Sequence, residues 1–289
     1  MLSRRAFITL TALSMPQWLR AAPQRLRALP GALAQLEQAN GGRLGVAVID
    51  TASGEHIGHR ATERFPMCST FKFLLAAAVL QRVDRRTETL TRALAIPPQP
   101  LLSHSPLTEP HAGGSMTIAE LCQAVLIQSD NTAANLLLDT IGGPGGITSF
   151  ARSIRDEVTR LDRTELTLNQ GLDGDPRDTT SPQAMAADLR ALLLGDVLSG
   201  AARAQLTTWM QACVTGLDRL RAKLPASWRA LDKTGTNGVH TSNDIGVFWP
   251  PGEPAVIVTA YLTQCFGSEG KRTAVLAEVG RLLVGALSV

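Results

Sequence analysis

Residues 66–80 read Pro-Met-Cys-Ser-Thr-Phe-Lys-Phe-Leu-Leu-Ala-Ala-Ala-Val-Leu. The run from Phe73 to Leu80 has no polar face, so it predicts a helix that is buried on all sides. Ser69 stands where this helix is expected to begin, and Lys72 follows three residues later. Because positions i and i+3 share a face of a helix, we expect the two side chains to lie close together.

The pair of Ser69 and Lys72 has a chemical interpretation. A serine hydroxyl is a weak nucleophile until a base takes its proton. A lysine becomes such a base only when desolvation or nearby cations lower its pKa. The buried helix would supply the desolvation, and its N-terminal N–H groups would favour a developing oxyanion. The alternative is an ordinary helix start with a surface lysine, because Ser-x-x-Lys also recurs by chance.

Lysine usage makes the chemical interpretation stronger. The chain has 28 basic residues, yet its lysines are only Lys72, Lys223, Lys233 and Lys271. Arginine stays protonated near neutral pH, whereas lysine can release its proton. A lysine at position 72 is therefore more suggestive here than in a lysine-rich chain.

Length and composition indicate a globular protein. The chain has 289 residues, of which 44% are hydrophobic and 18% are charged, enough for one large domain or two lobes. No run of about 18 apolar residues occurs, so we expect no membrane-spanning helix and no stable membrane anchor.

The N-terminus has the features of a twin-arginine export signal. Arg4 and Arg5 precede a short, mildly apolar stretch and the small residues Ala21 and Ala22. We expect residues 1–22 to be cleaved and the mature protein to be periplasmic; a disordered basic N-terminus is the alternative. Removal of residues 1–22 leaves equal numbers of basic and acidic residues, so nucleic acid is not an expected partner.

The cysteines indicate neither a metal site nor a redox motif. Cys68, Cys122, Cys213 and Cys265 are too widely spaced for either. Exported proteins do form disulfides, but the sequence establishes no pair. We expect buried free thiols.

Periodicity places the secondary structure along the chain. Helical spacing and helix start signals predict helices at 24–39, 117–128, 132–140, 182–195, 200–212 and 271–286. Alternating apolar residues predict strands at 44–48, 55–60, 229–236, 243–249 and 254–263. Residues 84–116 are expected to be irregular, and the glycine cluster at 142–146 is expected to be a loop.

This order predicts an α+β fold. The terminal segments would form an antiparallel five-stranded sheet flanked by terminal helices, and the middle would form an all-helical lobe. We expect one two-lobed domain over 23–289, with a sheet lobe at about 23–62 and 213–289 and a helical lobe at about 63–212. Residues 160–178 form a long segment without periodicity, here called the omega-type loop; such loops are usually functional.

Three further motifs carry polar side chains suited to chemistry. Ser129-Asp130-Asn131 lies at a predicted break between helices, where short polar side chains are free to enter a cleft. Lys233-Thr234-Gly235 lies on a strand near the C-terminus. Glu165-Leu166-Thr167-Leu168-Asn169 lies in the omega-type loop.

With these motifs in this order, the chain resembles the class A serine β-lactamases over essentially the whole mature sequence. Flanking segments agree, namely SDNTAANLLL at 129–138, VTRLDR at 158–163 and RDTT at 177–180. The resemblance implies a β-lactamase/transpeptidase-like fold with its site between the lobes. It also implies hydrolysis of penicillins and cephalosporins, and hence β-lactam resistance, by a monomer without metal or cofactor.

The resemblance also implies residue roles. Ser69 would be acylated with help from Lys72, and Glu165 with Asn169 would activate the deacylating water. Either Lys72 or Glu165 would be the acylation base. Substrate binding and proton relay would fall to Ser129, Asn131, Lys233, Thr234, Gly235 and Thr236. The backbone N–H groups of Ser69 and Thr236 would form the oxyanion hole.

Two departures from the family pattern are informative. Many members have an arginine on the strand after Lys-Thr-Gly, but residues 239–244 contain none. We expect Arg219 to supply that charge, and His104 to line the mouth of the cleft. Some relatives pair the cysteine at position 68 with a second one, but Asn237 stands at about that place, so this disulfide is not expected.

The omega-type loop needs a closed neck if it is to hold Glu165 in place. Arg163 and Asp178 flank the loop, and the resemblance supports a bidentate ion pair between them. Two solvated loop charges are the alternative.

Other functions fit the sequence less well. A DD-peptidase or penicillin-binding protein, or a non-catalytic β-lactam sensor, would lack the Glu165 and Asn169 pair. A β-lactamase with a tyrosine base is excluded, because Tyr261 is followed by Leu262-Thr263 and lacks an asparagine two positions on. A catalytic zinc site is also rejected, because His56 and His59 have no evident third ligand.

Overall fold

The computed structural model describes residues 26–287. The predicted signal at 1–22 therefore lies outside the described residues. Within the described part, no helix combines the length and the apolar character that crossing a membrane requires.

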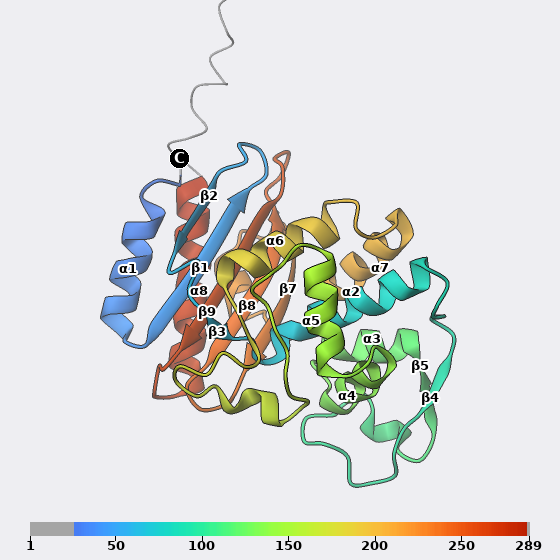
Figure 1. Cartoon of the computed structure of the whole chain (residues 1–289). Coiled ribbons are helices and arrows are strands. Elements are labelled where there is room, and N and C mark those ends of the chain that lie inside the picture. Colours follow the sequence, from blue (N-terminus) through green and yellow to red (C-terminus); the bar gives the residue numbers. More distant parts are fainter. Residues whose placement is uncertain (1–25, 288–289) are drawn as a thin grey trace, which may run out of the picture.

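A five-stranded sheet forms one side of the molecule (Figure 1), with strand order β2-β1-β9-β8-β7 and antiparallel neighbours throughout. Its strands are β1 (Arg43–Asp50), β2 (His56–His59), β7 (Arg229–Thr236), β8 (Ser242–Trp249) and β9 (Val256–Thr263). Two short pairs lie outside it: β3 (Phe65–Pro66) with β6 (Thr179–Thr180), and β4 (Ala93–Ala95) with β5 (Ser115–Thr117). The predicted antiparallel five-stranded sheet is confirmed.

Helices lie on both sides of this sheet. The terminal helices α1 (Leu29–Asn40) and α8 (Glu269–Leu287) cover one face together (Figure 1). The other helices are α2 (Phe71–Asp84), α3 (Ile118–Ile127), α4 (Asn131–Thr140), α5 (Pro144–Ser153), α6 (Pro182–Leu193) and α7 (Gly200–Gln211). This arrangement confirms the predicted α+β class.

Side-chain alternation explains the two layers of helices. Leu44, Val46 and Val48 of β1 enter the core shared with α1 and α8, whereas Ala47 and Ile49 enter the core on the opposite side. Successive residues of a strand point to opposite faces, so one apolar strand contributes to both cores.

Helix α2 runs through the larger core. All of its residues from Phe71 to Leu80 are buried, which confirms the buried helix expected from the sequence. A helix without a polar face has no stable place on a surface. The packing around α2 therefore fixes the position of Ser69 at its start.

The expectation of a loop at 142–146 was wrong. Gly143 is the N-terminal cap of α5, and Pro144 occupies its first turn, where the fixed φ of proline is already helical. A Cβ on Gly146 would lie 2.1 Å from the carbonyl oxygen of Ile141, so a glycine is required there for close approach.

Other boundaries also differ from the prediction. Helix α1 begins at Leu29 rather than at 24, because residues 26–28 form a turn ahead of Pro30. Residues 84–116 are not wholly irregular, because they contain β4 and a 3₁₀ turn at Glu109–His111. The predicted capping box at the start of α3 is confirmed, with Thr117 and Glu120 bonding each other's backbone N–H.

Candidate active site

Ser69 lies in a single 3₁₀ turn, Cys68–Thr70, that leads directly into α2. The preceding residue, Cys68, has φ of 46°, a left-handed conformation that non-glycine residues rarely adopt. The hydroxyl of Ser69 donates a hydrogen bond to Oε1 of Glu165 at 3.4 Å. The start of α2 thus presents its serine to the omega-type loop.

Lys72 is fully buried one turn further along. Its Nζ donates to the carbonyl oxygen of Ser129 at 2.7 Å and to Oδ1 of Asn131 at 2.6 Å, and it lies 2.9 Å from Oε1 of Glu165. Among the described residues, no hydrogen bond joins Lys72 directly to the hydroxyl of Ser69. Burial lowers the pKa of Lys72, and the nearby Glu165 carboxylate only partly opposes this effect.

The predicted break between helices is present at Ser129. Helix α3 ends at Ile127, α4 begins at Asn131, and Ser129 has φ of 62°. The oxygen Oγ of Ser129 accepts from Lys233 Nζ at 3.0 Å and from Lys72 Nζ at 3.4 Å. Two lysines on different elements therefore hold one serine hydroxyl.

Asp130 points away from the cleft. Its carboxylate caps α4 by accepting from the backbone N–H of Ala133. It also accepts from the backbone N–H groups of Leu107 and Thr108 and from the Thr108 hydroxyl. Asp130 thus fixes the break that positions Ser129 and Asn131.

Lys233 lies on β7, and alternation places it on the same face as Leu231, toward the helical core. Its Nζ also donates to the carbonyl oxygen of Thr234 at 2.8 Å. Burial lowers the pKa of Lys233 to about 8, and the positive charge of Lys72 adds to this shift.

Gly235 permits β7 to approach the turn that carries Ser69. A Cβ at this position would lie 2.7 Å from the carbonyl oxygen of Met67 and 3.1 Å from the backbone nitrogen of Ser69. Asn243 of β8 fastens the same turn, because its Nδ2 donates to the carbonyl oxygens of Pro66 and Met67. No motif in the sequence points to Asn243.

The omega-type loop brings Glu165 and Asn169 together. Asn169 Nδ2 donates to Oε2 of Glu165 at 2.7 Å. Asn135 of α4 binds the Glu165 backbone twice: Nδ2 donates to its carbonyl oxygen at 2.9 Å, and Oδ1 accepts from its N–H at 3.0 Å. This role of Asn135 was not predicted, although Asn131 and Asn135 lie four residues apart on one face of α4.

Arg163 and Asp178 form an ion pair at the neck of the loop. Arg163 Nε lies 2.5 Å from Oδ2 of Asp178. The pair is not bidentate as expected, because Asp178 Oδ1 accepts from the backbone N–H groups of Asp162 and Arg163 instead. Arg163 Nη1 also donates to Gln170 Oε1, so this arginine links the start of the omega-type loop to its middle.

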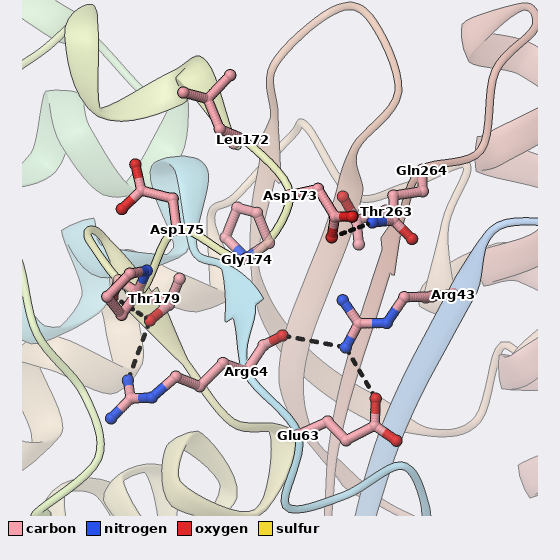
Figure 2. A pocket seen from close by; sticks show the side chains of 13 residues that line it. Arg43, Glu63, Arg64, Leu172, Asp173, Gly174, Asp175, Thr179, Thr263 and Gln264 are labelled. Atoms are coloured by element: carbon pink, nitrogen blue, oxygen red, sulfur yellow. Dashed lines mark hydrogen bonds and ion pairs between the residues drawn. The ribbon is translucent and has the colours of Figure 1, made fainter.

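The second half of the loop, from Gly171 to Pro176, lines a separate cavity of about 390 Å³ (Figure 2). Arg64 Nη1 donates to the Thr179 hydroxyl at 3.0 Å, and Gln264 Nε2 donates to Asp173 at 2.7 Å. Arg64 precedes β3, Thr179 begins β6 and Gln264 follows β9, so these contacts lie beside the end of the omega-type loop and away from Ser69.

The predicted site residues surround a pocket of about 660 Å³. Those that line it are Ser69, His104, Ser129, Asn131, Asn169, Arg219, Thr234, Gly235 and Thr236. Lys72, Glu165 and Lys233 are buried directly behind them. Arg163 and Asp178 do not line the pocket, in keeping with their expected place at the loop neck.

Arg219 is buried at one end of this pocket. Its Nη1 donates to the carbonyl oxygens of Gly235 and Asn243, at 2.9 and 2.8 Å. His104 has φ of 58°, and its Nε2 contacts the carbonyl oxygen of Gln128. Backbone carbonyl oxygens therefore hold both side chains: Arg219 at the Lys-Thr-Gly motif, and His104 just before the Ser-Asp-Asn motif.

All four cysteines are buried free thiols, as expected. Burial raises the pKa of Cys68 and Cys122 far above that of an exposed thiol. These thiols are therefore poor candidates for nucleophiles.

Comparisons with known proteins agree with this geometry. A family model described as the beta-lactamase enzyme family matches residues 28–287. Beta-lactamase L2 of Stenotrophomonas maltophilia is 48% identical over 98% of this chain and 98% of its own length. Beta-lactamase CTX-M-8 of Citrobacter amalonaticus is also 48% identical, over 87% of this chain and 86% of its own.

Solved structures show the same relationship. An ancestral class A β-lactamase is 60% identical, with a TM-score of 0.88, and the match covers 89% of this chain and 99% of the other. A β-lactamase from Xanthomonas campestris is 50% identical with a TM-score of 0.89, covering 91% of this chain and 99% of the other. The chain therefore belongs to the β-lactamase enzyme family, as one of its class A members.

Proposed function

We propose that this protein is a serine β-lactamase that hydrolyses the β-lactam amide bond of penicillins and cephalosporins and so confers resistance to them. The observation that carries the proposal is the carboxylate of Glu165, which is bonded to Asn169 and lies beside both Ser69 and Lys72. Such a group serves the hydrolysis of an acyl-enzyme as well as its formation.

In the first step, Ser69 Oγ attacks the β-lactam carbonyl carbon. Two groups can take its proton: the Glu165 carboxylate, to which it donates a hydrogen bond, and the amine of Lys72, whose pKa is lowered by burial. The backbone N–H groups of Ser69 and Thr236 receive the developing oxyanion. The close approach of β7 to the Ser69 turn at Gly235 supports this assignment.

Ser129 then protonates the departing ring nitrogen. Lys72, which contacts both Glu165 and Ser129, passes the proton lost by Ser69 on to Ser129 Oγ, so the Glu165 carboxylate is free again for deacylation. Two lysine ammonium groups donate to the oxygen of Ser129, so its own proton remains available for transfer to the substrate.

The substrate carboxylate binds at Thr234, Thr236 and Arg219, which line the same end of the pocket. Asn131 contacts the acylamide side chain.

Deacylation uses the other oxygen of Glu165. Asn169 Nδ2 binds Oε2 of Glu165, while the buried Asn169 Oδ1 has no hydrogen-bond partner among the described residues. Together the two side chains offer a water one basic acceptor and one amide acceptor. Glu165 deprotonates that water, which attacks the ester on Ser69 and releases the product.

The decisive experiment follows turnover and mass together. The mature protein is incubated with benzylpenicillin and a chromogenic cephalosporin, with and without EDTA. Many turnovers that EDTA does not change support the proposal. A stable stoichiometric adduct on the unmodified protein would instead indicate a penicillin-binding protein or a β-lactam sensor.

We also propose that the protein is exported through its paired arginines and acts as a periplasmic monomer. Replacement of Arg4 and Arg5 by lysine should retain the precursor in the cytoplasmic fraction. Light scattering on the mature protein should give one chain per particle; a stable dimer would contradict the monomer.

A further inference from the structure

One end of the active-site pocket is acidic. Asp218 and Glu269 both line the pocket next to Arg219. Glu269 is 56% exposed and lies 3.6 Å from Arg219 Nη2, too far for a hydrogen bond. Within residues 26–287, no side chain forms a hydrogen bond or an ion pair with the exposed Asp218 carboxylate. The pocket thus carries two weakly compensated negative charges.

Arg219 has a fixed position in the same part of the pocket. Only 5% of it is exposed, the carbonyl oxygens of Gly235 and Asn243 hold Nη1, and its Nε is buried without a hydrogen-bond partner in the described chain. If Arg219 receives the substrate carboxylate, Asp218 and Glu269 lie close to that anion and weaken its binding through like-charge repulsion. A cation carried next to the substrate carboxylate would reverse this effect.

We propose that Asp218 and Glu269 form a subsite for a cationic group of the substrate. The enzyme therefore prefers β-lactams with a positive charge close to the ring carboxylate, such as cephalosporins with a pyridinium group on the C3 methylene. In a cephalosporin, C3 is bonded to the carbon that bears the carboxylate. A carboxylate bound at Arg219, Thr234 and Thr236 thus places the C3 substituent near the two acidic side chains.

This inference rests on the proposed function, and the test separates the two. Cephaloridine and cephalothin carry the same thienylacetamido group at C7, but the C3 substituent is a pyridinium in the former and a neutral acetoxy group in the latter. The measured quantity is the ratio of kcat/KM for cephaloridine to that for cephalothin. If the wild-type protein hydrolyses neither compound, the proposed function fails.

Asp218→Asn and Glu269→Gln should each lower this ratio by about two- to fivefold, as expected for partly exposed charge pairs. The loss should come from cephaloridine, while cephalothin is hydrolysed as well as before or better. High salt should reduce the wild-type ratio, because screening weakens exposed charge pairs.

Matched controls are Asp196→Asn and Glu253→Gln, which remove exposed carboxylates that lie outside the pocket. They should leave the ratio unchanged. A ratio that is unchanged in Asp218→Asn and Glu269→Gln, or that falls equally in the controls, would overturn the subsite. A variant that is only less stable loses activity toward both substrates alike, so its ratio of kcat/KM for cephaloridine to that for cephalothin does not change.

Discussion

Lys72 Nζ lies 2.9 Å from Oε1 of Glu165, and both side chains are fully buried. The cation belongs to the first turn of α2 and the carboxylate to the omega-type loop, so the contact joins two distant parts of the chain. A buried charge is tolerated when an opposite charge and hydrogen bonds compensate it. Because Ser69 Oγ donates to the same oxygen, this pair serves acylation and deacylation together.

Replacing Glu165 with glutamine should trap the acyl-enzyme. The amide keeps the size of the side chain but cannot take a proton from water, so kcat should fall by about 10²- to 10⁴-fold. Acylation continues, because Lys72 remains as a base for Ser69 and its pKa is lowered by burial. Mass spectrometry after incubation with benzylpenicillin should show one adduct on Ser69. Glu253→Gln, at an exposed site, is the control and should keep wild-type turnover; rapid turnover by Glu165→Gln would refute the role of Glu165.

The pH dependence of substrate binding should report Lys233. Burial lowers its pKa to about 8, so it loses its positive charge as the pH rises through that value. KM for penicillins should rise above about pH 8. Lys233→Arg should shift this rise to higher pH, because arginine stays protonated up to about pH 12. An alkaline limb with the same midpoint in the variant would assign the titration to another group, such as Lys72.

The sequence predicted the residues that carry the chemistry better than it predicted their contacts. Ser69, Ser129 and Lys233 were identified from local motifs, and all lie at one pocket. The buried contact between Lys72 and Glu165 could not be predicted from local spacing, because helical spacing relates Lys72 only to neighbours on its own helix; only the family resemblance linked the two residues. Its partner Glu165 belongs to a distant loop, and only tertiary packing brings the two together.

Two asparagines escaped prediction for a related reason. Asn135 fastens the backbone of Glu165, and Asn243 fastens the turn before Ser69. An amide that binds distant backbone has no local signature, because a solvated asparagine gives the same sequence pattern. Alternation predicted β1 well, since its apolar side chains between Leu44 and Ile49 each enter one of two cores. Helix α5 was partly hidden by its opening glycines.

Asp178→Asn should loosen the omega-type loop. It removes the charge from an ion pair with Arg163 and weakens the bonds that Oδ1 accepts from two backbone N–H groups. A hydrogen bond to a charged group contributes about 1.5–3 kcal/mol, so amide exchange within 160–178 should become about 10- to 100-fold faster. Turnover of bulky cephalosporins should change as well.

The control for this variant is Asp173→Asn, which removes a carboxylate of the same loop that binds Gln264 at the surface. It should leave exchange near the neck and the kinetics unchanged. Wild-type exchange rates together with wild-type kinetics in Asp178→Asn would show that the ion pair does not hold the loop.

Arg219→Ala should weaken binding of the substrate carboxylate. The loss of charge-assisted hydrogen bonds should raise KM for benzylpenicillin by about 10- to 100-fold, and inactivation by clavulanate should also weaken. Arg281→Ala, at an exposed arginine paired with Glu278, is the control for loss of positive charge. An unaltered KM in a folded Arg219→Ala protein would refute this role, and its melting temperature reports folding.

Asp188→Asn should stabilise the protein at neutral pH. Asp188 lies on α6 against Asp156, and burial together with that neighbour raises the pKa of Asp188 well above 3.8. The folded state therefore keeps a proton that the unfolded chain loses near pH 4, so stability falls as pH rises from about 4 toward the folded pKa.

Asparagine never ionises, and its amide can donate to the buried Oδ2 of Asp156, which has no hydrogen-bond partner in the described chain. The melting temperature of the variant, measured relative to wild type, should thus increase between pH 4 and pH 8. At pH 8 the gain should correspond to about 1–3 kcal/mol in the free energy of unfolding. The exposed substitution Asp196→Asn should show no such trend. A difference that stays constant across this pH range would mean that Asp188 is not a buried acid kept neutral by its surroundings.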